Sequence, residues 1–194
     1  EWELPEAFLP QIAEYCNQLN IEFGCTPFYL TAVDILFPYV DFYKVASYEL
    51  LWDELLIKCA RTGKPVILST GMASMEEIKH ACQVINEQNC EPIILHCNSA
   101  YPTPVEHANL AAIETIRSEL DVPVGWSDHS VNENVLKRAI YKWGASTIEF
   151  HLDIDEKGAE YQSGHCWLPE KIEKVIVDIR KVSLLDGNGV KEPS

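Results

Sequence analysis

Short apolar runs alternate along this chain with longer segments in which apolar residues recur every three or four positions. The short runs predict buried strands and the longer segments predict amphipathic helices. We expect strands at six places, residues 21–28, 40–47, 65–68, 92–95, 122–126 and 147–150. We expect helices at residues 1–20, 50–62, 75–89, 109–120, 133–143 and 169–182.

Strands that alternate with helices indicate an α/β fold, a parallel sheet with helices outside it. A (β/α)₈ TIM-type barrel has eight such units in about 250 residues. Six units after a leading helix predict an incomplete barrel, in which residues 1–184 supply strands 3 to 8 and residues 185–194 form a tail or linker. The alternative is a six-stranded doubly wound sheet, which the absence of a glycine-rich phosphate turn disfavours.

Two neighbouring apolar runs each end at a histidine, His129 after residues 122–126 and His151 after residues 147–150. A helix-like segment joins them, so the unit reads as strand, helix, strand. Because neighbouring strands lie about 4.8 Å apart, the two imidazoles can share one metal ion. Two histidines with oxygen donors suit Mn²⁺ or Mg²⁺, with Zn²⁺ as an alternative. Taken singly, either histidine could instead be a hydrogen-bonded core or surface residue.

The other strand ends carry small hydroxyl or amide groups and one lysine, a set that suits the oxygens of a phosphate or carboxylate. A serine or threonine at such a position can also be a turn former or helix cap. Lys44 is the sharpest signal, because a lysine between Tyr43 and Val45 in a strand is costly unless it is paired. The set comprises Thr26, Lys44, Ser47, Ser69, Thr70, Asn98, Ser99 and Ser127.

Two glutamates accompany these strand ends. Glu149 precedes His151 by two residues, so in a regular strand both side chains point to the same side. An inward Glu149 needs a cation or hydroxyl donors, whereas an outward one would pack on a helix. The second glutamate, Glu49, follows Ser47 in the loop after the strand 40–47. We expect His96 to lie in the core.

Acidic residues outnumber basic ones by 30 to 15 among 194 residues. This balance argues against nucleic acid and anionic membranes as partners. The printed chain shows neither a secretory leader nor an apolar run long enough to span a bilayer, and its seven cysteines include no Cys-x-x-Cys pair. We therefore expect a cytoplasmic protein with reduced, mostly buried thiols.

Several of these segments together resemble the sialic acid synthases, in that family's order and over nearly the whole chain. The matching segments are Thr26-Pro27-Phe28, Tyr43-Lys44-Val45-Ala46-Ser47, Ile67-Leu68-Ser69-Thr70-Gly71-Met72, His96-Cys97, Tyr101-Pro102-Thr103-Pro104, Ser127-Asp128-His129 and Ile148-Glu149-Phe150-His151.

The resemblance implies an incomplete barrel that condenses phosphoenolpyruvate with an N-acetylated hexosamine such as N-acetylmannosamine, giving a nine-carbon sialic-acid-type sugar and phosphate. It implies a homodimer, and a divalent ion held by His129 and His151, usually Mn²⁺ with Mg²⁺ as an alternative. The ion would polarise the sugar aldehyde. The implied phosphoenolpyruvate site is Thr26, Lys44, Ser47, Ser69 and Ser127 with Asn98 or Ser99, and the implied catalytic or sugar-binding residues are Glu49, Tyr101, Glu149 and Glu160.

The chain also departs from the family pattern. The family's first two strands, with a glutamate and a second lysine, and its small C-terminal domain have no counterpart here. The loop 158–167 differs from the usual Gly-Pro-Asp-His type, so Glu160 stands where an aspartate often contacts the sugar, and Phe150 replaces a common lysine. Two rival functions remain: a non-catalytic sugar- or anion-binding domain, and a lyase or aldolase that uses Lys44 as a Schiff base.

Overall fold

The computed structural model describes residues 4–182, so the predicted tail 185–194 lies outside the described residues. Seven strands alternate with helices. The strands are β1 (Gly24–Cys25), β2 (Phe42–Val45), β3 (Val66–Ser69), β4 (Ile93–Cys97), β5 (Val124–Asp128), β6 (Ile148–Leu152) and β7 (Cys166–Trp167). The helices are α1 (Leu9–Leu19), α2 (Leu30–Leu36), α3 (Asp53–Arg61), α4 (Met75–Asn86), α5 (Ala112–Leu120), α6 (Glu133–Tyr141), α7 (Ala159–Gln162) and α8 (Pro169–Val182), with short 3₁₀ turns η1 (Glu6–Phe8), η2 (Ser47–Glu49) and η3 (Val105–His107).

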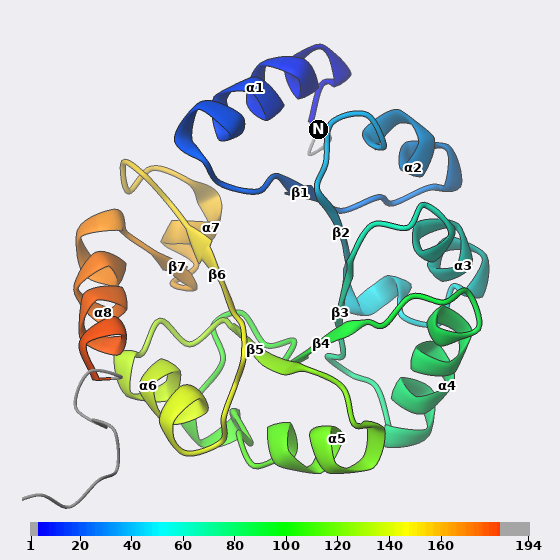
Figure 1. The fold of residues 1–194 in the computed structure, drawn as a ribbon. Helices are drawn as coiled ribbons and strands as arrows, with labels where there is room; N and C mark the ends of the chain where they lie inside the picture. Colours follow the sequence, from blue (N-terminus) through cyan, green and yellow to red (C-terminus); the bar gives the residue numbers. More distant parts are fainter. Residues whose placement is uncertain (1–3, 183–194) are drawn as a thin grey trace, which may run out of the picture.

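The seven strands form one parallel sheet in which each strand pairs with the next one along the chain. Seen down its axis, the sheet curves around a centre and the helices lie outside it (Figure 1). A doubly wound sheet reverses its strand order at a switch point, and no reversal occurs among the described strands. The doubly wound alternative is therefore wrong.

One ion pair shows how strongly the sheet curls. Strands β2 and β6 are four places apart in the sheet, which in a flat sheet would separate them by about 19 Å. Lys44 on β2 nevertheless brings its Nζ to 3.4 Å from an oxygen of Glu149 on β6. The sheet is thus a curled half-barrel, whose inner face brings distant strands together. That it belongs to an eight-unit barrel stays a prediction.

The predicted elements differ from the observed ones mainly in the short pieces. The expected count of six strands missed β7, which has two residues, and the segment 153–164, expected to be a polar loop, contains α7. Helix α2 was also missed. The strands β4, β5 and β6 continue two residues past their predicted ends. As a result, Ser127 and His151 lie inside strands, where the ladder fixes which way their side chains point.

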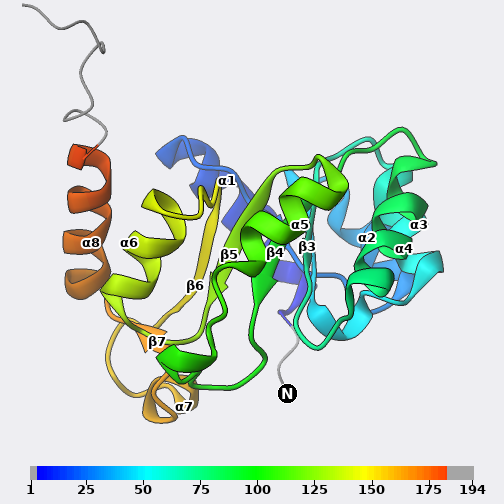
Figure 2. The same ribbon diagram turned by 90° about the horizontal axis from the view of Figure 1, so that it is seen from below.

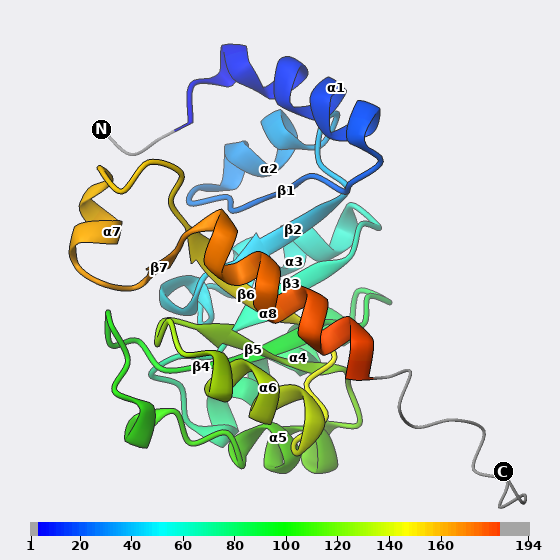
Figure 3. The ribbon, with the colours of Figure 1, turned by 90° about the vertical axis from the view of Figure 1, so that its left-hand side faces the viewer.

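The hydrophobic core lies between the outer face of the sheet and the surrounding helices. Tyr43 and Trp126, both fully buried, point outward from β2 and β5, and the Tyr43 hydroxyl donates to the Val33 carbonyl of α2 at 2.8 Å. Helix α8 lies beside α6 on this outer side (Figure 3). Most outward residues of the strands are apolar, apart from His96 and Asp128, and the inward residues include the polar groups Lys44, Ser69, Ser127 and Glu149.

All seven cysteines are free thiols, as the sequence predicts, and four of them are buried. Within residues 4–182, no helix combines the length and apolar character needed to cross a bilayer.

Candidate functional site

The register of the parallel sheet places polar side chains on its inner face. Cys97 pairs with Ser127, and Ser127 pairs with Glu149, so these positions on β4, β5 and β6 form one layer. The same parity turns Lys44 of β2 and Ser69 of β3 inward, because Lys44 pairs with Ile67. The loops that follow the strands, including α7 and the segment after β4, project from the same end of the sheet (Figures 2 and 3).

Glu149 lies at the centre of this layer. One of its oxygens accepts a hydrogen bond from the Ser127 hydroxyl at 2.7 Å, and the other lies 3.4 Å from Lys44 Nζ. The inward Glu149, expected to need a cation or hydroxyl donors, has one of each, and Lys44 has a charged partner. Only 14% of the Lys44 side chain is exposed, so its charge is held inside the curled sheet.

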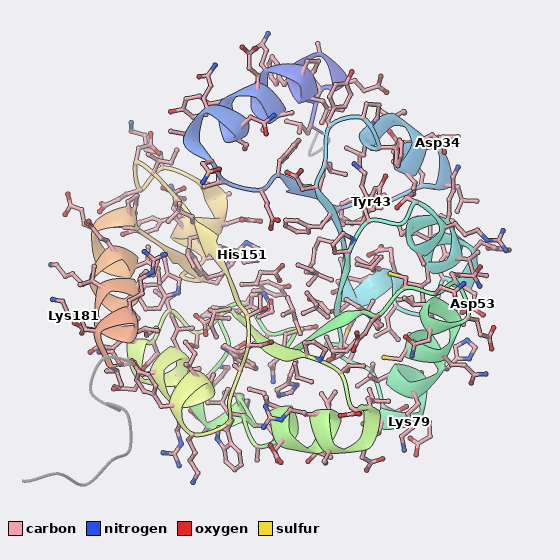
Figure 4. The ribbon with its side chains drawn as sticks, in the orientation of Figure 1. Asp34, Tyr43, Asp53, Lys79, His151 and Lys181 are labelled. Atoms are coloured by element: carbon pink, nitrogen blue, oxygen red, sulfur yellow. The ribbon has the colours of Figure 1, made fainter. Side chains whose placement is uncertain are left out.

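The two predicted metal ligands lie in the next layer up. His129 follows Ser127 by two residues, just past the end of β5, and His151 follows Glu149 by two residues within β6. Their ring centroids are 5.2 Å apart. Figure 4 shows His151 on the inner side of the ring of strands. Two imidazoles that each reach one ion through a bond of about 2.1 Å place their centroids roughly 5 to 6 Å apart. The observed spacing therefore fits one shared ion.

The hydrogen bonds that the two rings make through Nδ1 set the tautomer that a metal ligand needs. His129 Nδ1 lies 2.8 Å from the Asn98 carbonyl, which only accepts, so Nδ1 carries the proton and Nε2 keeps its lone pair. His151 Nδ1 likewise lies 3.1 Å from a carboxylate oxygen of Glu160. Burial lowers the pKa of His129, which favours the neutral ring that ligates metals.

A second group of small polar side chains surrounds Gly71, just beyond β3. The Gly71 N–H donates to Ser47 Oγ at 3.0 Å, and Ser47 Oγ lies 3.4 Å from Cys97 Sγ. A Cβ on Gly71 would lie 2.2 Å from Ser99 Oγ. A side chain at residue 71 would therefore have to displace Ser99, and would crowd Cys97 and Ser47.

Two buried polar atoms of the site have no hydrogen-bond partner within the described part of the chain, Ser69 Oγ and Glu49 Oε2. Such groups cost free energy, so an unpaired one at a strand end is a place where a ligand can bind. Burial raises the pKa of Glu49, and the nearby Lys44 ammonium opposes that rise only in part.

The loop after β4 closes one side of the site. The ring of Tyr101 lies over His129 with centroids 4.0 Å apart, and burial raises the pKa of its hydroxyl to about 12. The Asn98 side chain is used within this loop, since its amide donates to the His107 carbonyl and its oxygen accepts from the Ala100 N–H. Asn98 thus shapes the loop that supports His129.

The other two predicted site residues lie further from Lys44. Thr26 is half-buried just after β1, and no side-chain hydrogen bond joins it to Lys44 or Glu149 within residues 4–182. Glu160 lies on α7 and contacts His151. The predicted residues therefore form an inward layer around Lys44, Ser127 and Glu149 and a histidine layer above it, with Thr26 to one side.

Sequence reasoning missed three residues close to the histidines. His165 has its ring centroid 4.9 Å from that of His151, and Cys166 pairs with His151 in the β6–β7 register. Asp128 is fully buried on the outer face of β5. The alternation of side chains along β5 could have placed Asp128 outside, but β7 is too short for its pattern to reveal His165 and Cys166.

Asp128 accepts hydrogen bonds from two indoles, those of Trp126 at 3.1 Å and Trp167 at 3.0 Å. It also accepts from the Ser130 hydroxyl and from the backbone N–H groups of Ser130 and Val131. These bonds tie the end of β5, next to His129, to strand β7. Asp128 therefore holds β5 and β7 together.

Comparison with known proteins gives a consistent assignment. The profile described as the NeuB family matches residues 1–191. An uncharacterized protein of Methanocaldococcus jannaschii is 40% identical over 98% of this chain and 57% of its own length. The N,N'-diacetyllegionaminic acid synthase of Legionella pneumophila is 32% identical over 99% of this chain and 55% of its own length.

Among solved structures, the N-acetylneuraminic acid synthetase of Leptospira borgpetersenii, crystallised with citrate, superimposes with a TM-score of 0.89 at 31% identity. The match covers 99% of this chain and 67% of that one. The chain spans little more than half the length of the curated relatives above. The curled parallel sheet, its motifs and these matches show that the chain belongs to the NeuB family, whose relatives include synthases of sialic-acid-type sugars.

Proposed function

We propose that this chain carries the catalytic centre of a metal-assisted synthase that condenses phosphoenolpyruvate with an N-acetylated hexosamine. The products would be a nine-carbon sialic-acid-type sugar and inorganic phosphate. The observation that carries the proposal is the inward layer of Lys44, Ser127 and Glu149 directly beneath two histidines with free Nε2 atoms. The family assignment supports the same chemistry.

Phosphoenolpyruvate would bind at the inward layer that contains Lys44, Ser127 and Glu149. Lys44 supplies a positive charge, and hydroxyl groups supply donors for the phosphate and carboxylate oxygens. Ser69 fits this role best, because its buried hydroxyl has no partner within the described residues. We assign the donor site to Thr26, Lys44, Ser47, Ser69, Ser99 and Ser127, with Asn98 acting through its loop.

The sugar would lie above this layer, against the histidines. His129 and His151 would hold a divalent ion, Mn²⁺ or Mg²⁺, which would act as a Lewis acid on the sugar aldehyde. Asn98 and Glu160 would fix the two rings by accepting their Nδ1 protons. Tyr101, stacked on His129, would form a wall of the sugar site.

Glu49 and Glu149 would handle protons. Burial raises the pKa of Glu49, which brings a carboxyl closer to the range in which it can both give and take a proton near neutral pH. Glu149 accepts a hydrogen bond from Ser127 and forms an ion pair with Lys44, so it lies beside two groups with which it could exchange a proton. We further expect the active protein to be a cytoplasmic homodimer.

The test is phosphate release by the full-length protein, supplied with phosphoenolpyruvate, Mn²⁺ and a set of N-acetylated hexosamines. We expect His129→Ala or His151→Ala to lower the rate by about 100-fold or more, because each removes one of two protein ligands of the ion. His80→Ala is the matched control, since His80 pairs with Asp53 on the exposed surface at 2.9 Å.

Turnover unchanged in both His129→Ala and His151→Ala would contradict the metal assignment. Binding of phosphoenolpyruvate without phosphate release from any sugar would instead favour the rival function, an anion-binding domain without catalysis. Trapping of a substrate on Lys44 by borohydride would favour the Schiff-base rival.

A further inference from the structure

Four potential metal ligands gather where β6 meets β7. They are His151, Glu160, His165 and Cys166, and one ligand atom from each lies within 4.8 Å of the others. His151 lies in β6, Glu160 in α7 and Cys166 in β7, and His165 directly precedes β7. Each of these residues is therefore held in place by a fold of only sixteen residues, 151–166.

The strand register explains why the group forms. His151 and Cys166 are direct partners in the parallel β6–β7 pair, so their side chains start about 5 Å apart. His165 precedes Cys166, and its side chain is almost completely buried, with 7% exposed. Glu160 remains about half exposed, which leaves an entry path from solvent.

A hydrogen-bonded chain fixes the tautomer of His165. The Ser163 hydroxyl donates its only proton to the Glu160 carbonyl at 2.7 Å. The same Ser163 oxygen lies 2.7 Å from His165 Nδ1, so Nδ1 must be the donor in that contact. In the neutral ring Nε2 then keeps its lone pair, which is what a metal ligand requires.

This tautomer turns the lone pair of His165 Nε2 toward Glu160 Oε2, 4.0 Å away. The Cys166 thiol, at 4.0 Å, and His151 Nδ1, at 3.1 Å, donate protons to the same oxygen. A bound cation would replace these two protons, so that sulfur and nitrogen become ligands. A lone pair, a sulfur and a carboxylate oxygen at these distances are attracted to a cation placed between them. In a tetrahedral site with bonds of about 2.0 to 2.3 Å, ligand atoms lie roughly 3.3 to 3.8 Å apart. The group needs to contract by about an ångström.

We propose that His151, Glu160, His165 and Cys166 form a site for a thiophilic divalent cation of the Zn²⁺ class. A thiolate, two imidazoles and one carboxylate are the donors that Zn²⁺ binds in tetrahedral sites. The set differs from the His129–His151 pair, because it contains a sulfur and lacks His129. It shares His151 with that pair, but it does not depend on the proposed synthase activity.

Cobalt(II) tests the site directly, because a thiolate bound to Co²⁺ gives a charge-transfer band in the near ultraviolet. The full chain is reduced, freed of metal with a chelator and titrated with Co²⁺. We expect one band that saturates at one equivalent, is lost in Cys166→Ser and is displaced by Zn²⁺. Cys16→Ser is the control, since Cys16 is a partly exposed thiol on α1 and is not a member of the set.

Two further variants separate this site from the proposed catalytic pair. His129→Ala should retain the band, because His129 is not a member of the set. Glu160→Gln should keep the fold and weaken Co²⁺ binding by about 10-fold or more, since it removes one ligand at an exposed position. Glu160→Gln also keeps the test valid if Cys166→Ser does not fold.

Absence of the band at saturating Co²⁺, or an equal band in Cys166→Ser, would overturn the proposal. Loss of the band in His129→Ala would also overturn it, because that result would place the ion at the other histidine pair. Phosphate release plays no part in these measurements, so failure of the proposed synthase activity would leave their outcome unchanged.

Discussion

Asp128 and Glu149 are carboxylates on adjacent strands, and the two faces of the sheet treat them differently. Asp128 points outward from β5, where five donor groups from the indoles and the 130–131 turn surround it. Glu149 points inward from β6 and accepts from one serine beside one lysine. The first is fully buried, whereas about a third of the second side chain is exposed.

The difference separates a structural carboxylate from a functional one. Asp128 has used its whole capacity as an acceptor, so no ligand can gain from approaching it. Glu149 can still accept further hydrogen bonds, and it pairs with the Lys44 ammonium, which a bound anion could also contact. A buried carboxylate with complete bonding stabilises the fold, whereas an incompletely bonded one in an open layer marks a site.

The largest expected effect is on stability, at Asp128. Asp128→Ala leaves two buried indole N–H groups without an acceptor, so we expect the free energy of unfolding to fall by about 3 to 5 kcal/mol. Urea denaturation measures it. Glu149→Gln is the matched control and should change stability by less than about 1 kcal/mol, because its site is partly solvated. Equal losses in the two variants would contradict the distinction.

The second largest expected effect is on phosphoenolpyruvate binding, at Lys44, which pairs with Glu149. Lys44→Met should weaken phosphoenolpyruvate binding by about 10- to 100-fold, since a charged hydrogen bond contributes roughly 1.5 to 3 kcal/mol. Glu149→Gln should tighten it, because the Lys44 ammonium then has no competing carboxylate. Calorimetry measures both, with Lys79→Met as control, since Lys79 pairs with Glu119 on the surface. Weaker binding in Glu149→Gln would show that this carboxylate helps to hold the donor.

The smallest effect concerns pH and the outward-facing His96 of β4. Burial lowers its pKa, although Nε2 contacts to the Ala108 and Asn109 carbonyls oppose the shift. Below about pH 6.5 the unfolded chain therefore binds a proton that the folded chain does not, and stability falls as the pH drops. This single group contributes a slope of at most about 1.4 kcal/mol per pH unit.

His96→Gln should reduce that slope, because glutamine does not titrate and its amide can still donate to the same carbonyls. Urea unfolding at several pH values between 5 and 7 compares the two proteins. His129 and His165 also have pKa values lowered by burial, and their contribution is common to both proteins. Identical slopes would show that His96 is protonated without cost in the folded state.

The sequence by itself determined the fold class and most of the inner layer. Short apolar runs, often β-branched, identified six strands. A lysine or glutamate inside an apolar strand has few explanations other than a paired, inward position. For this reason Lys44, Glu149, Ser127 and the two strand-end histidines could be found without coordinates. The segments that resemble the sialic acid synthases contain the same residues.

Tertiary structure alone decided which partners those residues meet. The Lys44–Glu149 pair spans five strands, so only the curl of the sheet creates it. The group at His165 and Cys166 depends on β7, whose two residues are too short to carry a periodic signal. Local pattern fixes the direction of a side chain, but the curvature of a sheet depends on the packing of every strand and helix at once, and no short stretch of sequence contains that information.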